Sequence, residues 1–409
     1  MLFHAVLNRM IQRGTLTVHT PGGRVAHYGN GDMPQATISI GSYRAMRRLL
    51  LNPALALGEL YMEGELVPGE GQLYQLLDLV MLNQHEGAGH AVEALRQATR
   101  LLRRRWDQLN PAGRARRNVA HHYDLNGRLY ALLLDRDRQY SCAYFREGSE
   151  TLEAAQQAKL RHIAAKLCLV RPGLEVLDIG CGWGGMALHL AREWGARVTG
   201  ITLSEEQLGV ARQRAAEAGL DGQVRFELMD YRDWRQPVDR IVSVGMFEHV
   251  GVNHYDRFFG VVKRALAADG VALVHSIGRQ SGPGATGPWI RKYIFPGGYS
   301  PALSEVLPAV ERSGLWLTDV EILRLHYAET IGHWRRRFAA NRDAIAALYD
   351  ERFCRMFEFY LVASELCFRR SDHMNFQLQL APGRDAVPLV RDYMARAEGE
   401  AAARARVSA

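Results

Sequence analysis

No run of apolar residues in this 409-residue sequence approaches the roughly 20 needed to cross a bilayer as a helix. The first residues also lack a basic segment followed by an apolar one, so we expect no secretory signal peptide. The chain has only five cysteines, and because their spacing does not suit a metal site, no metal is predicted. Scattered cysteines fit free thiols in a reducing compartment, which favours a cytoplasmic location.

Acidic residues are the minority charge: the chain has 44 of them against 51 lysines and arginines, a formal net charge of +7. This excess favours an anionic partner, either nucleic acid or a phospholipid surface. Composition does not choose between them, and mild basicity can also serve solubility alone. The length exceeds what one hydrophobic core usually supports, so two domains are expected.

The stretch from Leu174 to Gln207 organises the rest of the chain. Its apolar run ends abruptly at Gly180, as a buried parallel strand would. A helix is predicted over 186–194 and a second strand over 197–202. Strand, glycine turn, helix and strand make a βαβ unit, whose ligand crevice lies at the carboxyl ends of the strands.

The glycines that begin at Gly180 match the G-x-G-x-x-G pattern of dinucleotide sites. Such a site needs an acidic residue at the end of the second strand, where this chain has Thr202. The acid is instead Asp178, just before the first glycine. That arrangement resembles the S-adenosylmethionine (AdoMet) methyltransferases, in which the acid faces the methionine ammonium. A core turn with a chance cluster of glycines is the alternative.

Strands and helices continue to alternate after Gln207, which predicts an α/β fold with a doubly wound, mostly parallel, Rossmann-like sheet. We assign this domain, of the class I AdoMet methyltransferase type, to 119–395. The predicted strands are 224–228, 238–244, 270–275, 315–323 and a last edge strand at 375–380; the predicted helices are 208–218, 255–266, 303–313 and a long region at 344–368. The tail, 396–409, is rich in alanine and arginine and is expected to be flexible.

Residues 1–100 are expected to form a separate, small α+β domain with helices near 3–11, 43–51 and 71–82. Its basic and apolar faces suit a lipid, membrane or dimer role, or only its own core. An arginine-rich linker follows at 101–118; it could bind lipid or RNA phosphates, or could simply be solvated. The aromatic and histidine-rich segment from 118 to 145 is predicted to fold over the cofactor as a lid.

Seven blocks of sequence carry a more specific resemblance, which covers nearly the whole chain. In order they are H-H-Y-D-L at 121–125, Y-S-C-A-Y-F at 140–145, L-D-I-G-C-G-W-G-G at 177–185, T-L-S-E-E-Q at 202–207, F-E-H-V-G at 247–251, Y-I-F-P-G-G at 293–298 and H-Y-A-E-T at 326–330. Together they resemble the cyclopropane-fatty-acyl-phospholipid synthases and the related mycolic acid cyclopropane synthases.

The resemblance implies a set of cofactor contacts, which includes the acid and cysteine of the glycine turn. They are Tyr140, Ser141, Asp178, Gly180, Cys181, Gly182, Thr202, Leu203, Gln207, Asp230, Tyr231 and Val244. Thr202 and Gln207 can hydrogen-bond the ribose hydroxyls. Tyr231 offers a ring face for adenine, and Asp230 could accept a hydrogen bond from the adenine amine or a neighbouring backbone group.

The resemblance also implies a catalytic group that holds a bicarbonate ion: Cys142, Glu248, His275, Ile277 and Tyr327. An alkene that attacks the sulfonium methyl leaves a carbocation, and ring closure then needs a base inside an apolar tunnel. Because an anion would repel an ionised Glu248, we expect the pKa of this residue to be raised. A surface role for Glu248 and a core role for His275 are the alternatives.

These observations predict AdoMet-dependent methylene transfer to the cis double bond of unsaturated phospholipid acyl chains, with bicarbonate as the base. The expected partners are membrane phospholipid and a peripheral membrane surface, without nucleic acid, and a homodimer is compatible. A fatty-acyl C-methyltransferase that leaves a methylene or methyl branch would use the same residues. An RNA methyltransferase and a catalytically silent lipid-binding protein are more distant alternatives.

Overall fold

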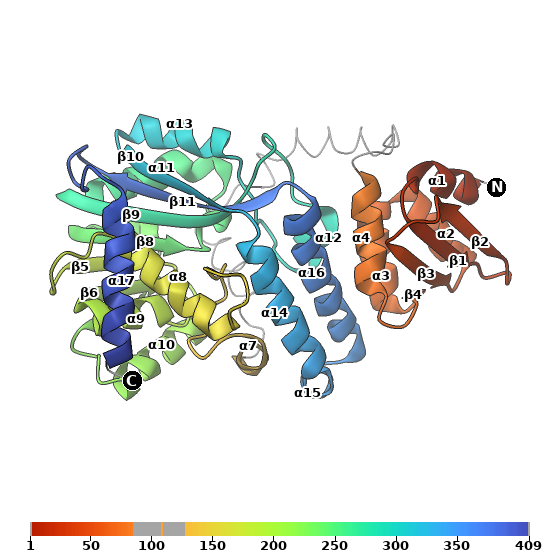
Figure 1. Ribbon diagram of the computed structural model, residues 1–409, viewed down its shortest axis with the longest axis horizontal. Coiled ribbons are helices and arrows are strands. Elements are labelled where there is room, and N and C mark those ends of the chain that lie inside the picture. The colour runs from red at the N-terminus through yellow and green to blue at the C-terminus, as the bar shows by residue number, and fades with distance from the viewer. Residues whose placement is uncertain (1, 85–107, 109–126, 408–409) are drawn as a thin grey trace. The chain divides into compact units, whose positions relative to one another are not determined.

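The computed structural model describes residues 2–84, 108 and 127–407 (Figure 1). By their contacts these residues divide into two compact units. The first comprises the described residues up to 104 together with 285–296 and 331–372; the second comprises those of 105–284, 297–330 and 373 onward. The predicted linker at 101–118, apart from residue 108, and the H-H-Y-D-L block lie outside the described residues.

The first unit has a four-stranded sheet of order β2-β1-β3-β4. The strands are β1 (Thr15–His19), β2 (Val25–Gly29), β3 (Gln35–Ile40) and β4 (Leu66–Pro68). Alternating residues such as Leu16, Val18, Ile38 and Ile40 are buried, as their period of two predicts. Strand β2 was not predicted, because Tyr28 is its one fully buried residue and the apolar alternation is weak.

The helices of this unit pack on the small sheet or on one another. They are α1 (Leu2–Met10), α2 (Tyr43–Leu51), α3 (Pro53–Glu63), α4 (Leu73–Gln84), α12 (Pro288–Tyr293), α15 (Arg342–Leu348), α16 (Glu351–Arg370) and most of α14 (His326–Ala340). The long helix predicted at 344–368 is in fact two helices. Asp350 separates them, because its carboxylate caps α16 by accepting from the Phe353 N–H at 2.7 Å.

Two later segments of the chain belong to this first unit, which differs from the continuous domain expected at 119–395. Helix α12 is tied to α3 because Glu59 accepts from Lys292 at 2.6 Å and from Tyr293 at 2.9 Å. Helix α16 is tied to α4 by the ion pair between Arg370 and Asp78 at 2.6 Å. Such distant pairings have no signature in local periodicity, so the sequence could not reveal them.

The second unit contains a seven-stranded sheet of order β10-β11-β9-β8-β5-β6-β7. The strands are β5 (Glu175–Ile179), β6 (Arg197–Thr202), β7 (Val224–Leu228), β8 (Val238–Val244), β9 (Leu266–Arg279), β10 (Trp316–Leu323) and β11 (His373–Ala381). The prediction of β11 as an edge strand is wrong. It lies between β9 and β10, antiparallel to both, and is buried along almost its whole length, so β10 forms that edge.

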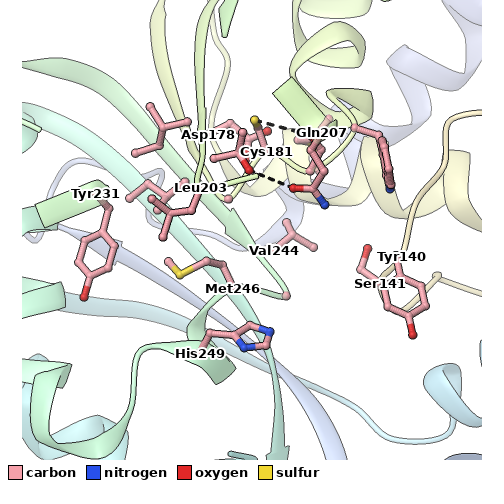
Figure 2. A pocket seen from close by; sticks show the side chains of 18 of the residues that line it. Tyr140, Ser141, Asp178, Cys181, Leu203, Gln207, Tyr231, Val244, Met246 and His249 are labelled. Atoms are coloured by element: carbon pink, nitrogen blue, oxygen red, sulfur yellow. Dashed lines mark hydrogen bonds between the residues drawn. The ribbon is translucent and has the colours of Figure 1, made fainter. Parts of the chain in front are cut away.

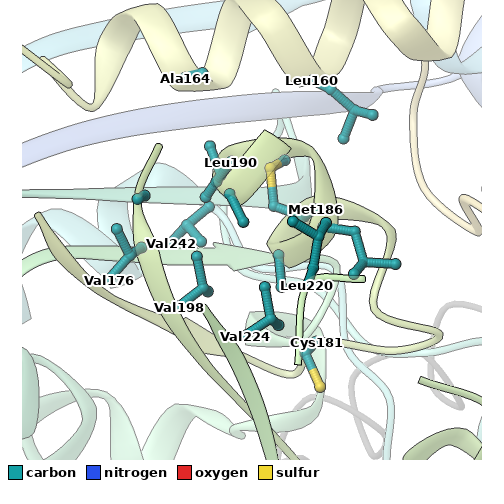
Figure 3. Close-up of a cluster of buried hydrophobic side chains, with 14 of the residues drawn as sticks. Leu160, Ala164, Val176, Cys181, Met186, Leu190, Val198, Leu220, Val224 and Val242 are labelled. Atoms are coloured by element: carbon teal, nitrogen blue, oxygen red, sulfur yellow. The ribbon is translucent and has the colours of Figure 1, made fainter. Parts of the chain in front are cut away.

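Helices cover both faces of this sheet, which confirms the doubly wound α/β fold. They are α7 (Gly127–Leu133), α8 (Leu152–Lys166), α9 (Gly185–Trp194), α10 (Glu205–Glu217), α11 (Tyr255–Ala265), α13 (Leu303–Ser313) and α17 (Asp392–Val407). Figure 3 shows one core, in which α8 and α9 place Leu160 and Leu190 over strand residues such as Val176 and Val242. A second core joins α11 and α13 to the opposite face.

The order of the strands determines where a ligand can bind. From β5 the chain runs outward through β6 and β7, then returns to β8 on the other side of β5. Strands β5 and β8 therefore flank the topological switch point, where the two connections leave in opposite directions. In open α/β sheets the binding crevice opens at this point, outside the carboxyl ends of the strands.

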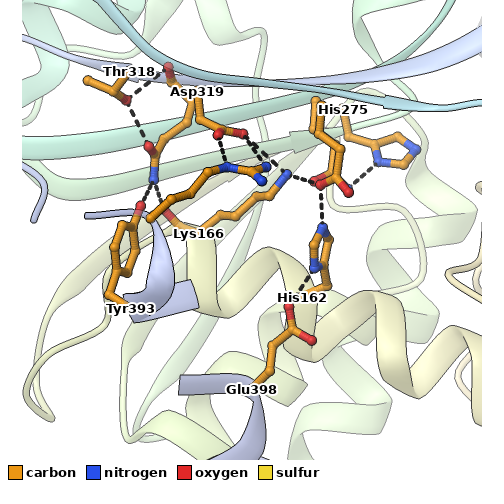
Figure 4. A network of polar contacts seen from close by, with 11 residues as sticks. His162, Lys166, His275, Thr318, Asp319, Tyr393 and Glu398 are labelled. Carbon is orange, nitrogen blue, oxygen red and sulfur yellow. Dashed lines mark hydrogen bonds and ion pairs between the residues drawn. The ribbon is translucent and has the colours of Figure 1, made fainter. Parts of the chain in front are cut away.

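The tail at 396–409, expected to be flexible, is helical as part of α17 as far as Val407. Figure 4 shows why this helix is held. Glu398 of α17 lies 2.6 Å from His162 Nδ1 on α8, and the opposite ring nitrogen lies 2.7 Å from Glu321 of β10. Ala401 is buried as well. Composition alone suggested fraying because it does not reveal these distant partners.

None of the helices in the described part of the chain combines the length and apolarity needed to cross a bilayer. Within residues 2–84, 108 and 127–407, no group of three or more histidines, cysteines and acids is arranged to hold a metal ion.

Candidate active site

A pocket lies at the carboxyl ends of β5, β6, β7 and β8, entirely within the second unit (Figure 2). All twelve predicted cofactor residues line it: Tyr140, Ser141, Asp178, Gly180, Cys181, Gly182, Thr202, Leu203, Gln207, Asp230, Tyr231 and Val244. They come from four strand ends and from the segment before α8, so the fold gathers residues that are up to about a hundred positions apart in the chain. That these residues bind the cofactor remains a prediction.

The glycine turn between β5 and α9 needs its glycines for two reasons. Gly180 has φ of 82° and Gly184 has φ of 83°, a region that side chains rarely adopt. A Cβ at Gly180 would also lie 2.7 Å from Cβ of Met246, and one at Gly184 would lie 2.8 Å from the Phe226 ring. The turn therefore presents bare backbone to the pocket, as a closely packed ligand requires.

Asp178 is the last residue but one of β5 and is only 2% exposed. Its Oδ2 atom has no hydrogen-bond partner among the residues that the structure describes. Burial raises the pKa of this carboxyl group to about 7, and the positive charge of Lys159 opposes the rise. A buried acceptor without a partner is unfavourable, so the site fits a ligand that brings a cationic donor, such as the ammonium of AdoMet.

Thr202 and Gln207, the predicted ribose ligands, bind each other in this structure. The Thr202 hydroxyl donates to Gln207 Oε1 at 3.0 Å. Ser204 caps α10 by accepting from the Gln207 N–H at 3.2 Å, which places the start of the helix beside the pocket. A ribose would have to replace or share the bond between these two side chains.

Asp230 follows β7 and is 3% exposed. It accepts from the backbone N–H of Arg232 at 3.0 Å and pairs with the guanidinium of the same residue at 2.5 Å. Asp230 was predicted to accept either from the adenine amine or from a neighbouring backbone group, and the structure contains the second of these bonds. Beside it, Tyr231 packs edge-on against Phe258, with ring centroids 5.3 Å apart, and remains part of the pocket wall.

The predicted lid contributes Tyr140 and Ser141 through an irregular segment between α7 and α8. Asp135 holds one end of it by accepting from the N–H groups of Asp137 at 2.9 Å and Gln139 at 2.8 Å. Arg214 of α10 binds Asp137 at 3.0 Å. The segment is thus fixed by side chains rather than by regular secondary structure. A lid motion remains a prediction.

None of the five predicted catalytic residues lines the pocket itself, but the structure brings two of them into direct contact. Glu248 lies in the short helix η2 (Phe247–His249), and its Oε1 accepts from the backbone N–H of Ile277 at 2.6 Å. Burial raises the pKa of Glu248 to about 7, which confirms the expected direction. The Ile277 N–H, expected to donate to an anion, is therefore already used by Glu248.

His275 lies two residues before Ile277 on β9 and is 1% exposed. Burial, reinforced by the charge of Lys159, lowers its pKa to about 3, so the ring is neutral. Its Nδ1 lies 3.1 Å from the amide nitrogen of Gln377, and its Nε2 lies 3.4 Å from that of Asn375. Since a neutral imidazole accepts at one nitrogen only, one of these amides must present its oxygen instead.

Cys142 and Tyr327 form the remaining part of the predicted group. Cys142 is buried, and burial raises its thiol pKa, so it is a weak donor rather than a nucleophile. Its neighbour Ala143 donates its N–H to the hydroxyl of Thr330 at 3.0 Å. Thr330 lies three residues after the buried Tyr327 on α14, which anchors the cysteine segment near this helix.

The structure adds pocket residues that the sequence argument passed over. They are Arg138, Gln139, Trp183, Met246 and His249, among others. Trp183 and His249 stood inside blocks that were quoted for the resemblance, so their position could have been noticed. Gln139 and Met246 carry no such signal, because they reach the pocket through the irregular segment and the loop after β8.

Comparison with known proteins places the chain in a family. The family model described as mycolic acid cyclopropane synthetase matches residues 111–378, and a domain of unknown function matches residues 2–89. A cyclopropane-fatty-acyl-phospholipid synthase of Escherichia coli strain K12 is 39% identical over 355 residues, 87% of this chain and 90% of the relative. The chain belongs to the mycolic acid cyclopropane synthetase family.

Two further members of this family bear on the site. A probable fatty acid methyltransferase of Pseudomonas putida is 37% identical over 354 residues, 83% of this chain and 85% of its own. The crystal structure of mycolic acid cyclopropane synthase CmaA1, complexed with SAH and CTAB, matches with a TM-score of 0.61 and 34% identity. It covers 67% of this chain and 99% of the solved one.

Proposed function

We propose that the chain transfers a methylene group from AdoMet to the cis double bond of unsaturated phospholipid acyl chains and so forms cyclopropane fatty acids. The family relationship makes it an AdoMet-dependent methyltransferase, since a solved relative is a complex with SAH, the demethylated cofactor. The observation that supports the substrate most is the 39% identity to a cyclopropane-fatty-acyl-phospholipid synthase over 87% of the chain.

The pocket residues have clear tasks in this reaction. When bound, AdoMet supplies an electrophilic methyl group. The carboxylate of Asp178 would accept from the methionine ammonium, and the bare backbone after Gly180 would pack against the cofactor. Thr202 and Gln207 would exchange their mutual bond for the ribose hydroxyls. Binding would thus satisfy a buried acceptor that has no partner among the described residues.

We further propose that bicarbonate binds beside Glu248 and His275. With its pKa near 7, Glu248 can be protonated at Oε2 while Oε1 still accepts from Ile277, and it then becomes a donor to an anion. Neutral His275 contributes at most one N–H. These residues therefore fit an anion as long as Glu248 keeps its proton. Bicarbonate held there would supply the base for ring closure.

A decisive experiment uses vesicles of a monounsaturated phospholipid and AdoMet with a trideuterated methyl group. Cyclopropanation should add one CD₂ group to the acyl chain and remove the double bond, which NMR distinguishes from a methylene branch that also keeps two deuterium atoms. A product with three deuterium atoms would indicate a C-methyltransferase that leaves a methyl branch. Absence of any mass gain, with AdoMet bound, would contradict the proposal.

The C-methyltransferase is the second candidate because a 37% identical relative is named a probable fatty acid methyltransferase. Both reactions begin with the same attack on the methyl group, and they differ in whether a proton leaves before a hydride shifts. The base near Glu248 therefore decides between them. Varying bicarbonate in the deuterium experiment tests this: depletion should lower the fraction of product that contains a cyclopropane ring.

A further inference from the structure

Lys159 is a buried cation that the proposed reaction has not used. It lies on α8 and is completely inaccessible to solvent. Its ammonium donates to the side-chain oxygen of Gln139 and, at 2.9 Å, to the hydroxyl of Ser141. Both acceptors belong to the irregular segment that forms one wall of the pocket. The residues that bind the buried charge are thus themselves part of the pocket wall.

Gln156, one turn earlier on the same face of α8, holds the backbone of this segment. Its amide nitrogen donates to the carbonyl oxygen of Ser141 at 3.0 Å and to that of Gln139 at 3.4 Å. On the far side Gln139 lies against Gly185, where an added Cβ would collide with its amide. Helix α8 thus fixes both the backbone and the side chains of residues 139–141.

The charge of Lys159 acts on both parts of the site. It opposes the rise in pKa that burial causes at Asp178 and at Cys142, and it adds to the lowering of the pKa of His275. Burial lowers the pKa of Lys159 itself to about 8, while Asp135, Cys142, Asp137 and Asp178 act in the opposite direction. At neutral pH the group is therefore mostly protonated.

We propose that Lys159 is a positioning residue that anchors Gln139 and Ser141 and whose charge makes the pocket discriminate against the sulfonium of AdoMet relative to the neutral thioether of S-adenosylhomocysteine (AdoHcy). The inference rests on the proposed use of AdoMet. The two ligands share their ammonium, carboxylate, ribose and adenine, so only the charge on sulfur differs. A cation behind the pocket wall raises the free energy of the charged form before methyl transfer.

Calorimetric titration of AdoMet and AdoHcy into the wild-type chain and the variants Lys159→Gln and Lys159→Met tests this. Both variants lose the charge, whereas Gln keeps a donor for the segment. The ratio of the two dissociation constants should shift toward AdoMet by on the order of tenfold in both. Met should also weaken both ligands. An unchanged ratio in folded variants overturns the inference.

Lys166→Met is the matched control. Lys166 is an equally buried lysine of α8, but it pairs with Glu321 of β10 rather than with the pocket segment. Its loss should leave the ratio at the wild-type value; an equal shift would show that any buried lysine has this effect and would overturn the assignment to Lys159. Failure of the wild-type chain to bind either ligand would instead contradict the proposed function.

The wild-type protein provides a second test if the variants do not fold. Between pH 7 and 9 Lys159 loses its proton, so the ratio should shift toward AdoMet by several-fold as the pH rises. Asp178 also titrates near pH 7, and its carboxylate would favour the sulfonium in the same direction, so only the shift between about pH 8 and 9, above that titration, is assigned to Lys159. Asp135, Asp137, Cys142 and His275 are the other groups around the charge. A ratio that does not change with pH overturns the proposal.

Discussion

The pKa values of Asp178 and Glu248 both rise to about 7, because each carboxyl group is buried. Their surroundings then separate their tasks. Asp178 faces the cofactor pocket with an oxygen that has no partner in the described part of the chain, so it is prepared for a cationic donor. Glu248 is held by the Ile277 N–H outside the pocket wall, where a retained proton suits an anion. Two carboxyl groups that are both buried are thus suited to ligands of opposite charge, a cation at Asp178 and an anion at Glu248.

Glu248→Gln should lower turnover by about 100-fold, because an amide N–H is a weaker donor to the bound anion than a protonated carboxyl group. The affinity for AdoHcy should stay within about threefold of wild type, since Glu248 does not line the cofactor pocket. Turnover is measured on monounsaturated vesicles and affinity by calorimetry.

The exposed Glu217→Gln on α10 is the control and should behave as wild type. Normal turnover of the Glu248 variant would show that this carboxyl group takes no part in the reaction.

At the scale of elements, the turn from β5 to α9 combines a left-handed backbone with close packing. Gly180→Ala should destabilise the protein by about 2–3 kcal/mol, because it forces a side chain into positive φ and against Met246. It should also reduce AdoHcy affinity, since this backbone lies in the pocket wall. Urea unfolding and calorimetry measure the two effects.

Gly209→Ala is the matched control within α10, where an added Cβ meets nothing within 4 Å. Alanine is the better helix former, so this change should leave stability unchanged or increase it by about 0.5–1 kcal/mol. Equal losses at both glycines would contradict the special role of the turn.

Helix α17 is held by His162, which joins Glu321 and Glu398. Burial alone would lower the pKa of His162, but its hydrogen bonds to both carboxylates raise it above 6.5. Burial alone would raise the pKa of Glu321, but His162 and Lys166 lower it to about 2. Charged His162 stabilises the folded protein fully below pH 6.5, and this stabilisation is lost as the pH rises through its raised pKa. The stabilisation by ionised Glu321 is complete above about pH 4.5 and is lost as the pH falls toward 2.

The contacts of His162 with Glu321 and Glu398 should therefore stabilise the protein most between about pH 5 and 6.5. His162→Gln should lower the free energy of unfolding by about 2 kcal/mol near pH 6, because two partly buried carboxylates lose a charged partner, and by less at pH 9. Urea unfolding at both pH values, with hydrogen exchange of residues 392–403, measures this. The exposed His19→Gln is the control. An equal loss at both pH values would contradict a charged histidine.

At the scale of the whole molecule, catalysis and substrate delivery are expected to belong to different parts of the chain. The predicted cofactor and catalytic residues all lie in the second unit. We propose that the first unit serves lipid or membrane contact or a homodimer, and that the enzyme works peripherally on the cytoplasmic face of a membrane. The net charge of +7 suits an anionic phospholipid surface.

The full chain should float with vesicles that contain anionic phospholipid and should largely dissociate near 1 M salt, where the Debye length falls to about 3 Å. Neutral vesicles should bind it more weakly, and light scattering after gel filtration reports whether it is a dimer. Equal binding to neutral and anionic vesicles would contradict an electrostatic contact.

The sequence by itself determined the βαβ unit, the doubly wound class and, through the resemblance, twelve of the residues that line the pocket. These features are local: apolar runs end at glycines, and strand ends of a parallel sheet meet at one edge. Residues predicted at separate strand ends, such as Asp178, Thr202 and Val244, therefore had to converge. The seven blocks added the family, which the comparisons confirmed.

Only the tertiary structure decided what depends on pairs of distant residues. In the fold, β11 lies inside the sheet and the Ile277 N–H donates to Glu248. Side-chain amides lie beside His275, and Glu398 of the tail contacts His162. The fold also buries Lys159 behind the pocket wall. Hydrogen bonds and burial between remote segments leave no periodic pattern in the chain, so they become visible only when the fold brings the partners together.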